Sequence, residues 1–357
     1  MKKYIILLFL SFAFFANAQQ QLNKTLFFDG INREYIIYIP ASYDGSEEYP
    51  LLFSFHGGAG FANDFINVND MRPIADTAGF IAIYPQAAID YDGADPGSTP
   101  STSWIHKAPT THNDVNFIAA IIDTLANEYL VDENRVYACG YSEGGIFSYE
   151  LGCRLNNRIA AFASVSGSMM VDAFRDSYYN LGFCSPIHPT AVMLIPGTND
   201  MSPHSTYSGF QPYYMSADEI TTYWSNYNNT DINPIISQLP NINTSDGSTV
   251  ERRVWEGGDN CVRIEELKVI GGDHDWPGSW GNMDISASDE IWNFVSKFDI
   301  NGLINCNTSS NHEIQITKDR KLIKITDMLG RDIKELKNIP LFYLYNDGIV
   351  EKKIIIK

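Results

Sequence analysis

Residues 136–145 have the sequence Val-Tyr-Ala-Cys-Gly-Tyr-Ser-Glu-Gly-Gly. An apolar, β-prone run changes here into a Gly-x-Ser-x-Gly pattern and then into a segment of helical character. This order is typical of a sharp strand-to-helix turn that presents a serine hydroxyl, because Gly140 and Gly144 remove the Cβ atoms that would collide at so tight a bend. The pattern predicts Ser142 as a nucleophile carried by a sheet with helices around it.

Short apolar runs on both sides of this turn have the length of buried strands. They cover residues 35–40, 51–55, 80–84, 159–165, 191–195 and 264–270. Residues 113–130 instead show helical spacing of apolar side chains, and a second helix is expected over residues 286–298. Because strands alternate with helices or long insertions, we predict an α/β fold with a mostly parallel sheet and helices on both faces.

Two segments rich in Ser, Thr, Asn, Gly, Pro and Tyr interrupt this alternation. They cover residues 89–107 and 206–246. We expect them to be loops, and loops of a sheet enzyme shape its site.

A serine needs a base within hydrogen-bond reach, and a carboxylate that orients the base, before it can transfer an acyl group. Asp200 follows the strand expected over residues 191–195, and His274 follows the strand expected over residues 264–270. The chain order Ser142, Asp200, His274 is the order of the α/β-hydrolase fold. These residues are the candidate nucleophile, orienting acid and base.

The neighbours of His274 allow two other interpretations. Asp273 and Asp275 compete with Asp200 as the orienting acid, but carboxylates next to His274 in sequence turn away from its ring more easily than toward it. Asp273, His274 and Asp275 could also be metal ligands, but no further His or Cys lies at ligand spacing. We therefore keep Asp200 and expect neither a metal nor another cofactor.

A tetrahedral intermediate also needs hydrogen-bond donors for its oxyanion. The strand expected over residues 51–55 leads into His-Gly-Gly-Ala-Gly at residues 56–60, where glycines let backbone amides approach a substrate oxygen. We expect the donors to be the amide of Glu143 and one amide of this loop, with Gly57 and Gly58 as the candidates. The Glu143 carboxylate, at the positive end of a helix dipole, is expected to act only electrostatically.

Together these segments resemble a known family, the secreted esterases grouped as polyhydroxybutyrate depolymerases, feruloyl esterases and acetyl xylan esterases. The similarity runs from about residue 35 to residue 277 and rests on residues 56–58, Trp104, 113–115, 140–145, 196–200 and 271–278. The resemblance implies the roles given above for Ser142, Asp200 and His274. It also implies that Trp276 lies beside the acyl pocket, and we expect Tyr141 and Trp104 to contact substrate. Family members commonly carry a small or amide residue where this chain has Glu143.

The resemblance implies hydrolysis of carboxylic esters through an acyl-enzyme, with acetyl or feruloyl esters on plant polysaccharide as the favoured substrates. Polyhydroxyalkanoate or its oligomers are the alternative substrate. A peptidase of the same fold is disfavoured because the usual prolyl peptidases carry a large extra domain that has no room here. The rival of another class is a catalytically silent secreted binding protein, which would have no physical reason to retain all three candidate residues.

Residues 1–18 have the features of a secretory signal peptide: two lysines, an apolar run and a final Ala-Asn-Ala. We therefore expect export by a secretion machinery to the cell surface or the medium. Five cysteines are compatible with that compartment. Cys153 and Cys184 flank the strand after the serine turn and match positions that often form a disulfide in the resembled family. Cys139 is expected to be a buried free thiol, while the pairing of Cys261 and Cys306 stays open.

The charge is unevenly distributed along the chain. The net charge is −18, but residues 301–357 contain ten Lys or Arg and seven Asp or Glu. An acidic main domain disfavours nucleic acid as a partner, and we expect none, because phosphate binding needs a basic surface. We expect an esterase domain over residues 19–300, a linker over 301–311 and a small β-rich tail over 312–357. The tail resembles the C-terminal sorting domains of type IX secretion in Bacteroidota, and a carbohydrate-binding module is its main competitor.

Overall fold

The computed structural model describes residues 19–90, 101–105, 113–306, 321–327, 331–334, 340–346 and 350–354. The chain divides into two units, Met1–Cys306 and Asn307–Lys357. The signal peptide expected over residues 1–18 lies outside the described residues. None of the helices in the described ranges has the length and apolar character needed to cross a membrane.

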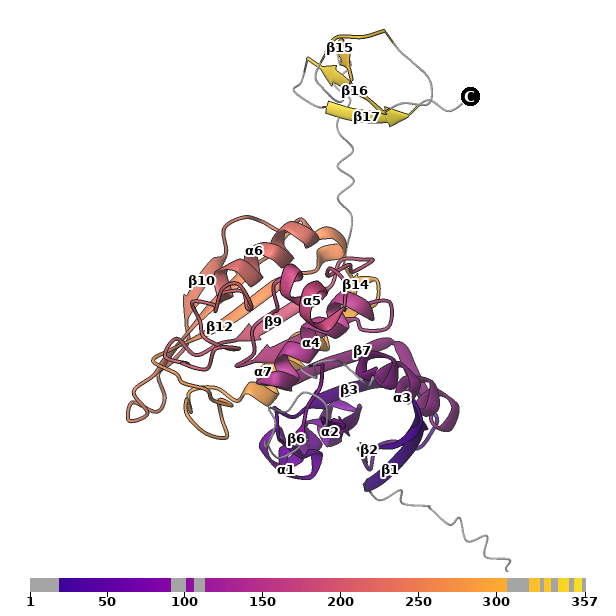
Figure 1. The fold of residues 1–357 in the computed structure, drawn as a ribbon, viewed down its shortest axis with the longest axis vertical. Coiled ribbons are helices and arrows are strands. Elements are labelled where there is room, and N and C mark those ends of the chain that lie inside the picture. The colour runs from indigo at the N-terminus through magenta and orange to yellow at the C-terminus, as the bar shows by residue number, and fades with distance from the viewer. Residues whose placement is uncertain are drawn as a thin grey trace, which may run out of the picture. The chain divides into compact units, whose positions relative to one another are not determined.

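The first unit is built on a ten-stranded sheet (Figure 1). In spatial order its strands are β1 (Gln20–Phe28), β2 (Ile31–Ile39), β4 (Ile81–Pro85), β3 (Tyr49–Phe55), β7 (Val131–Tyr141), β8 (Ala161–Val165), β9 (Ala191–Ile195), β12 (Ile264–Ile270), β11 (Thr249–Trp255) and β10 (Ile235–Gln238). All neighbours from β4 to β12 pair in parallel, whereas the outer strands pair antiparallel. The predicted mostly parallel sheet is confirmed.

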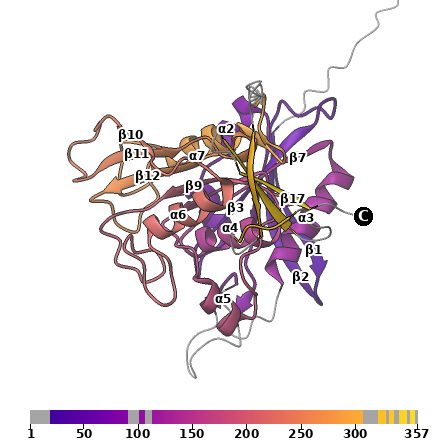
Figure 2. The same cartoon turned by 90° about the horizontal axis from the view of Figure 1, so that it is seen from above.

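Helices cover both faces of this sheet. Figure 2 shows α2 (Arg72–Ala78) and α7 (Ala287–Val295) on one side, and α3 (Asp114–Glu128), α4 (Glu143–Arg154) and α6 (Ala217–Asn228) on the other. Helix α1 (Ala62–Val68) shares the apolar core of α2 and α7. Because both faces are covered, β4, β8 and β9 are buried at every position and consist almost entirely of apolar residues.

The segment 206–246 is more ordered than its loop-like composition predicts. It contains α6, which begins at a capping box in which Ser216 and Glu219 satisfy each other's backbone amides, and the edge strand β10. The edge strand β1 and strand β11 were also not predicted from the apolar runs, because half-exposed strands carry too few apolar residues to stand out. Short elements complete the unit: β5 (Ile89–Asp90), β6 (Ser101–Thr102), α5 (Asp172–Tyr179), a 3-10 turn (Asp259–Cys261), β13 (Phe298–Asp299) and β14 (Gly302–Leu303).

Two disulfides cross-link the first unit. Cys153 pairs with Cys184, which confirms the favoured pair, and Cys261 pairs with Cys306. Cys139 is a buried free thiol, and burial raises its pKa to about 11. The Cys261–Cys306 bond and the β13–β14 hairpin hold residues 301–306 in the first unit, so the unit extends beyond the boundary expected at residue 300.

The second unit contains a three-stranded antiparallel sheet. Its strands are β15 (Leu322–Thr326), β16 (Pro340–Tyr345) and β17 (Val350–Ile354), with β16 in the centre. Leu341 and Tyr343 of the central strand are buried. The described residues of the tail therefore form a small β unit.

Candidate active site

Ser142 lies at the sharp turn between β7 and α4. It is the N-cap of α4 and has φ 55° and ψ −119°, a left-handed conformation that side chains rarely adopt. Its amide donates to the carbonyl of Val165 on β8 (2.9 Å). A Cβ added to Gly140 would collide with the backbone of Gly144, and one added to Gly144 would collide with the carbonyl oxygen of Phe55. Both glycines are needed for the turn to form.

The loops that follow β9 and β12 bring two further side chains to this serine. Nε2 of His274 lies 3.0 Å from Oγ of Ser142, and Nδ1 of His274 lies 2.7 Å from Oδ2 of Asp200. Asp200 is 1% exposed and Ser142 6%, whereas the His274 side chain is 26% exposed. The three groups form one chain of hydrogen bonds that meets solvent at the imidazole.

The surroundings of Asp200 keep it ionised. Burial acts to raise its pKa, but hydrogen bonds from His274, the amide of Ser202 and the hydroxyl of Ser205 outweigh burial, so the pKa lies below its ordinary value. Oγ of Ser205 also lies 3.0 Å from Nδ1 of His274. A carboxylate at this nitrogen favours the tautomer with a proton on Nδ1, which leaves Nε2 as an acceptor for the serine proton.

A second imidazole, which no motif of the sequence marks, lies at the serine. Nε2 of His204 is 3.3 Å from Oγ of Ser142, and its ring stands perpendicular to that of His274 at 5.8 Å. Burial, and then the charge of His274, lowers the pKa of His204. When the Ser142 hydroxyl donates to His274, His204 can contact Oγ only as a donor. Its place four residues after Asp200 was the available signal, but only the fold turns the ring toward the serine.

The glycine loop after β3 passes directly beside Ser142. A Cβ added to Gly57 would lie 3.3 Å from Cβ of Ser142. The loop is held by His56, whose Nε2 accepts from the amide of Ala87 (3.1 Å) and whose Nδ1 therefore donates to the carbonyl of Gly57 (2.7 Å). Glu143 begins α4, so its amide stands at the positive end of the helix. Of the candidate oxyanion donors, Gly57 and Glu143 thus flank the serine, and Gly58 lies against the side chain of Glu143.

The Glu143 carboxylate has a structural task beyond the electrostatic one expected. It is buried, and its Oε1 accepts hydrogen bonds from Oγ of Ser103 (2.6 Å) and from the amide of Trp104 (2.9 Å). The adjacent Thr102 carbonyl accepts from the amide of Ala59 in the glycine loop (2.8 Å). Glu143 therefore ties the first turn of α4 to residues 102–104, which in turn hold the glycine loop.

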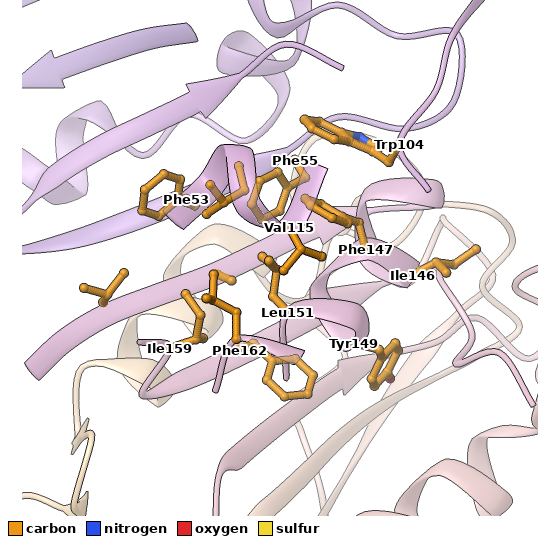
Figure 3. Packing of buried hydrophobic residues seen from close by; sticks show 14 of the residues in the cluster. Phe53, Phe55, Trp104, Val115, Ile146, Phe147, Tyr149, Leu151, Ile159 and Phe162 are labelled. Atoms are coloured by element: carbon orange, nitrogen blue, oxygen red, sulfur yellow. The ribbon is translucent and has the colours of Figure 1, made fainter. Parts of the chain in front are cut away.

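Two tryptophans expected to contact substrate are part of the core instead. Trp104 is fully buried, stacks on Phe147 at 4.9 Å and donates through Nε1 to the carbonyl of His56 (2.8 Å), as its place in Figure 3 illustrates. Trp276 is 1% exposed and packs edge-on against Phe65 of α1 at 5.4 Å. Their large apolar rings stabilise the loops through packing in the core, so neither tryptophan lines the site.

Tyr141 is also a supporting residue. Its hydroxyl donates to the carbonyl of His274 (2.8 Å), and its ring lies 5.0 Å from the imidazole. Burial raises the pKa of this phenol, so it remains a hydrogen-bond donor. In the described part of the chain, no group of three or more His, Cys, Asp or Glu residues is arranged to hold a metal ion.

Comparison with known proteins identifies the fold of the first unit. The chain is 27% identical over 281 residues to a bifunctional acetylxylan esterase/xylanase from Neocallimastix patriciarum and 25% identical over 279 residues to feruloyl esterase B from Piromyces equi. These matches cover 76% and 75% of the chain but only 34% and 46% of the two relatives. The solved acetyl xylan esterase from Aspergillus awamori superimposes with a TM-score of 0.53 at 16% identity, over 78% of this chain and 99% of that one. No protein-family model matches the chain. The first unit therefore has the α/β-hydrolase fold.

Proposed function

We propose that the protein is a serine esterase that hydrolyses carboxylic esters through an acyl-enzyme. The observation that carries this proposal is the continuous relay from Oγ of Ser142 through His274 to Asp200, with steps of 3.0 and 2.7 Å. Such a relay activates a hydroxyl whose own pKa is far too high for attack at neutral pH.

In the first half of the reaction, Oγ of Ser142 attacks the ester carbonyl carbon while Nε2 of His274 takes the serine proton. Asp200 stabilises the imidazolium that forms but stays ionised itself. The negative charge on the carbonyl oxygen is met by the amide of Glu143 and an amide of Gly57 or Gly58. The C–O bond to the alcohol then breaks, and His274 returns the proton to the leaving oxygen.

In the second half, a water molecule gives its proton to His274 and attacks the acyl carbon. The bond to Oγ of Ser142 breaks, His274 reprotonates Oγ, and the carboxylic acid leaves. His274 is the most exposed member of the relay, so water reaches the site on its side. No redox or group-carrying cofactor takes part in these steps.

The favoured substrates are acetyl or feruloyl esters on plant polysaccharide. Support comes from the two relatives described above, which are named acetylxylan esterase/xylanase and feruloyl esterase. A panel of p-nitrophenyl acetate, acetylated xylan, methyl ferulate and polyhydroxybutyrate, tested on one preparation, ranks these substrates. Hydrolysis of polyhydroxybutyrate alone would reassign the substrate class.

Ser142→Ala tests the mechanism. The variant is expected to stay folded and to lose several orders of magnitude in ester turnover, because removing a triad member leaves only the contribution of the oxyanion donors and of binding. Full activity in the folded variant would refute the relay, and lack of activity toward every ester in the unmodified protein would favour a silent binding protein.

We also propose that the protein is exported and that its tail is a sorting domain. The two disulfides support an oxidising compartment. Deletion of residues 311–357 is expected to leave esterase activity intact and to abolish surface delivery in the native host. Loss of intrinsic activity would instead assign the tail a structural or substrate-binding role.

A further inference from the structure

Four aromatic side chains gather on α5 and on the loop before α6. Tyr178, Phe210 and Tyr213 are 57%, 44% and 41% exposed, and Phe174 is half-buried between them. Phe174 stacks with Tyr178 at 5.4 Å and meets Tyr213 edge-on at 4.9 Å, while Phe210 stacks with Tyr213 at 5.6 Å. We call these four residues the aromatic surface. Clustered apolar rings in contact with water are typical of a binding surface.

The fold holds this surface rigidly against the helix that begins at the serine. Arg175 of α5 is fully buried and makes two hydrogen bonds, of 2.6 and 2.7 Å, to the carboxylate of Glu150 on α4. The Cys153–Cys184 disulfide joins the segment after α5 to the C-terminal turn of α4. Both views of the chain show α5 beside α4 (Figures 1 and 2). A paired buried arginine and a cross-link fix the orientation of the rings before any ligand arrives.

A row of ring contacts links the aromatic surface to the candidate active site. His204, whose Nε2 lies 3.3 Å from Oγ of Ser142, has its ring 6.4 Å from that of Tyr214. Tyr214 in turn lies 5.8 Å from Phe174. The backbone reinforces this path, because the amide of Val171, just before α5, donates to the carbonyl of Tyr213 (2.9 Å). Tyr214 itself is buried, so these contacts fix the exposed rings to the site through packing beneath the surface. Phe210 and Tyr213 lie on the same loop as His204, and a chain molecule with one group at Ser142 is expected to follow this loop to the exposed rings.

We propose that the aromatic surface binds the sugar backbone of a polysaccharide whose ester group occupies the site at Ser142. This proposal rests on the esterase function proposed above and adds a second binding site to it. Pyranose rings present flat faces of C–H groups that pack on aromatic rings, and their hydroxyls can hydrogen-bond to the phenols of Tyr178 and Tyr213. The surface would hold several sugar units beyond the esterified one.

The charges near the rings favour a neutral polymer over an anionic one. Helix α5 carries Asp172 and Asp176, and its single basic residue, Arg175, is buried and paired with Glu150. Together with the net charge of −18, this disfavours nucleic acid and anionic lipid as the occupant. A flexible aliphatic polyester would gain less from planar rings, because it has no flat face to stack.

The test measures binding in the absence of turnover. Ser142→Ala protein is titrated with insoluble acetylated xylan, and the bound fraction is determined by depletion from solution. Adding Tyr178→Ala and Tyr213→Ala is expected to weaken binding roughly tenfold, the size expected from the loss of two aromatic contacts. Phe27→Ala is the matched control, because this ring is 71% exposed and lies on the edge strand β1, outside α5 and the loop before α6. Its binding is expected to equal that of the parent.

The same pair of substitutions in the Ser142 protein gives a second readout. The loss in kcat/KM on acetylated xylan is expected to exceed the loss on p-nitrophenyl acetate roughly tenfold, because the small ester does not reach the rings. The melting temperature checks the fold, and Tyr178→Ala alone, at the most exposed ring, serves if the double variant is unstable.

Three results would overturn the proposal: no xylan binding by the parent, equal binding by the parent and the ring variants, or ring-dependent binding to polyhydroxybutyrate in place of xylan. Failure of the esterase proposal is distinguishable, because it appears as no hydrolysis of any small ester while the binding titration still reports on the rings.

Discussion

Glu143→Ala tests how the first turn of α4 controls the glycine loop. The substitution removes the acceptor of two hydrogen bonds, from Oγ of Ser103 at 2.6 Å and from the amide of Trp104 at 2.9 Å. Both donors lie in buried residues. Residues 102–104 are then no longer held by Glu143. The hydrogen bond from the amide of Ala59 to the carbonyl of Thr102 weakens, and the loop with Gly57 and Gly58 gains freedom to move.

The size of the effect follows from the burial of these groups. Each buried donor that loses its acceptor costs about 1–3 kcal/mol, so the free energy of unfolding should fall by about 2–6 kcal/mol. Complete loss of one oxyanion donor costs about 10²–10³ in kcat, which sets the upper limit for a displaced loop. We expect kcat to fall by roughly 10-fold to 10³-fold.

Glu143→Gln is the matched control, because the amide keeps an oxygen at the position of the acceptor and removes the charge. It is expected to lose about 1 kcal/mol of stability and less than roughly tenfold in kcat. The measurements are urea unfolding and turnover of p-nitrophenyl acetate. Unchanged kcat and stability in Glu143→Ala would refute the anchoring role. Equal damage in both variants would show that the charge at the helix N-terminus, and not the hydrogen bonds, matters.

The remaining predictions concern the buried groups around the site. Trp276→Ala should cost about 3–5 kcal/mol of stability and lower kcat/KM equally for acetyl and feruloyl esters, since the ring packs in the core. A selective loss on feruloyl esters with an unchanged melting temperature would instead show that Trp276 contacts the acyl group. Because the folded pKa of His204 is lowered, the unfolded chain takes up its proton first as the pH falls below about 6.5. The contribution of neutral His204 to the free energy of unfolding is therefore fully present above pH 6.5 and is lost toward lower pH. Unfolding midpoints measured across pH 5–7.5 should change less in His204→Gln than in the unmodified protein. Replacing Cys153 and Cys184, which are 31 residues apart, with Ala should cost about 3–4 kcal/mol in chemical unfolding, and equal midpoints would contradict a stabilising role for the bond.

Much of the architecture follows from local patterns that one sequence contains. Apolar runs of strand length mark the buried central strands, because strands covered on both faces must be apolar along their whole length. The glycines around Ser142 mark the turn, because no other residue fits so close to a neighbouring backbone. Asp200 and His274 could be selected from the sequence because both follow predicted strands, and parallel strands end at one edge of a sheet.

The partners of the buried polar and aromatic groups depend on long-range packing. Trp276 follows His274 by two residues, and Trp104 was selected only through a family resemblance, yet both rings turn inward because burial of a large apolar surface is favourable. His204 faces Ser142 only because the loop after β9 folds across the end of β8, where the amide of Ser168 donates to the His204 carbonyl. The acceptor role of Glu143 likewise requires residues 102–104 to pass over α4. Local pattern specifies where a strand or turn forms, whereas the direction of each side chain at the site is set by contacts between segments far apart in the chain.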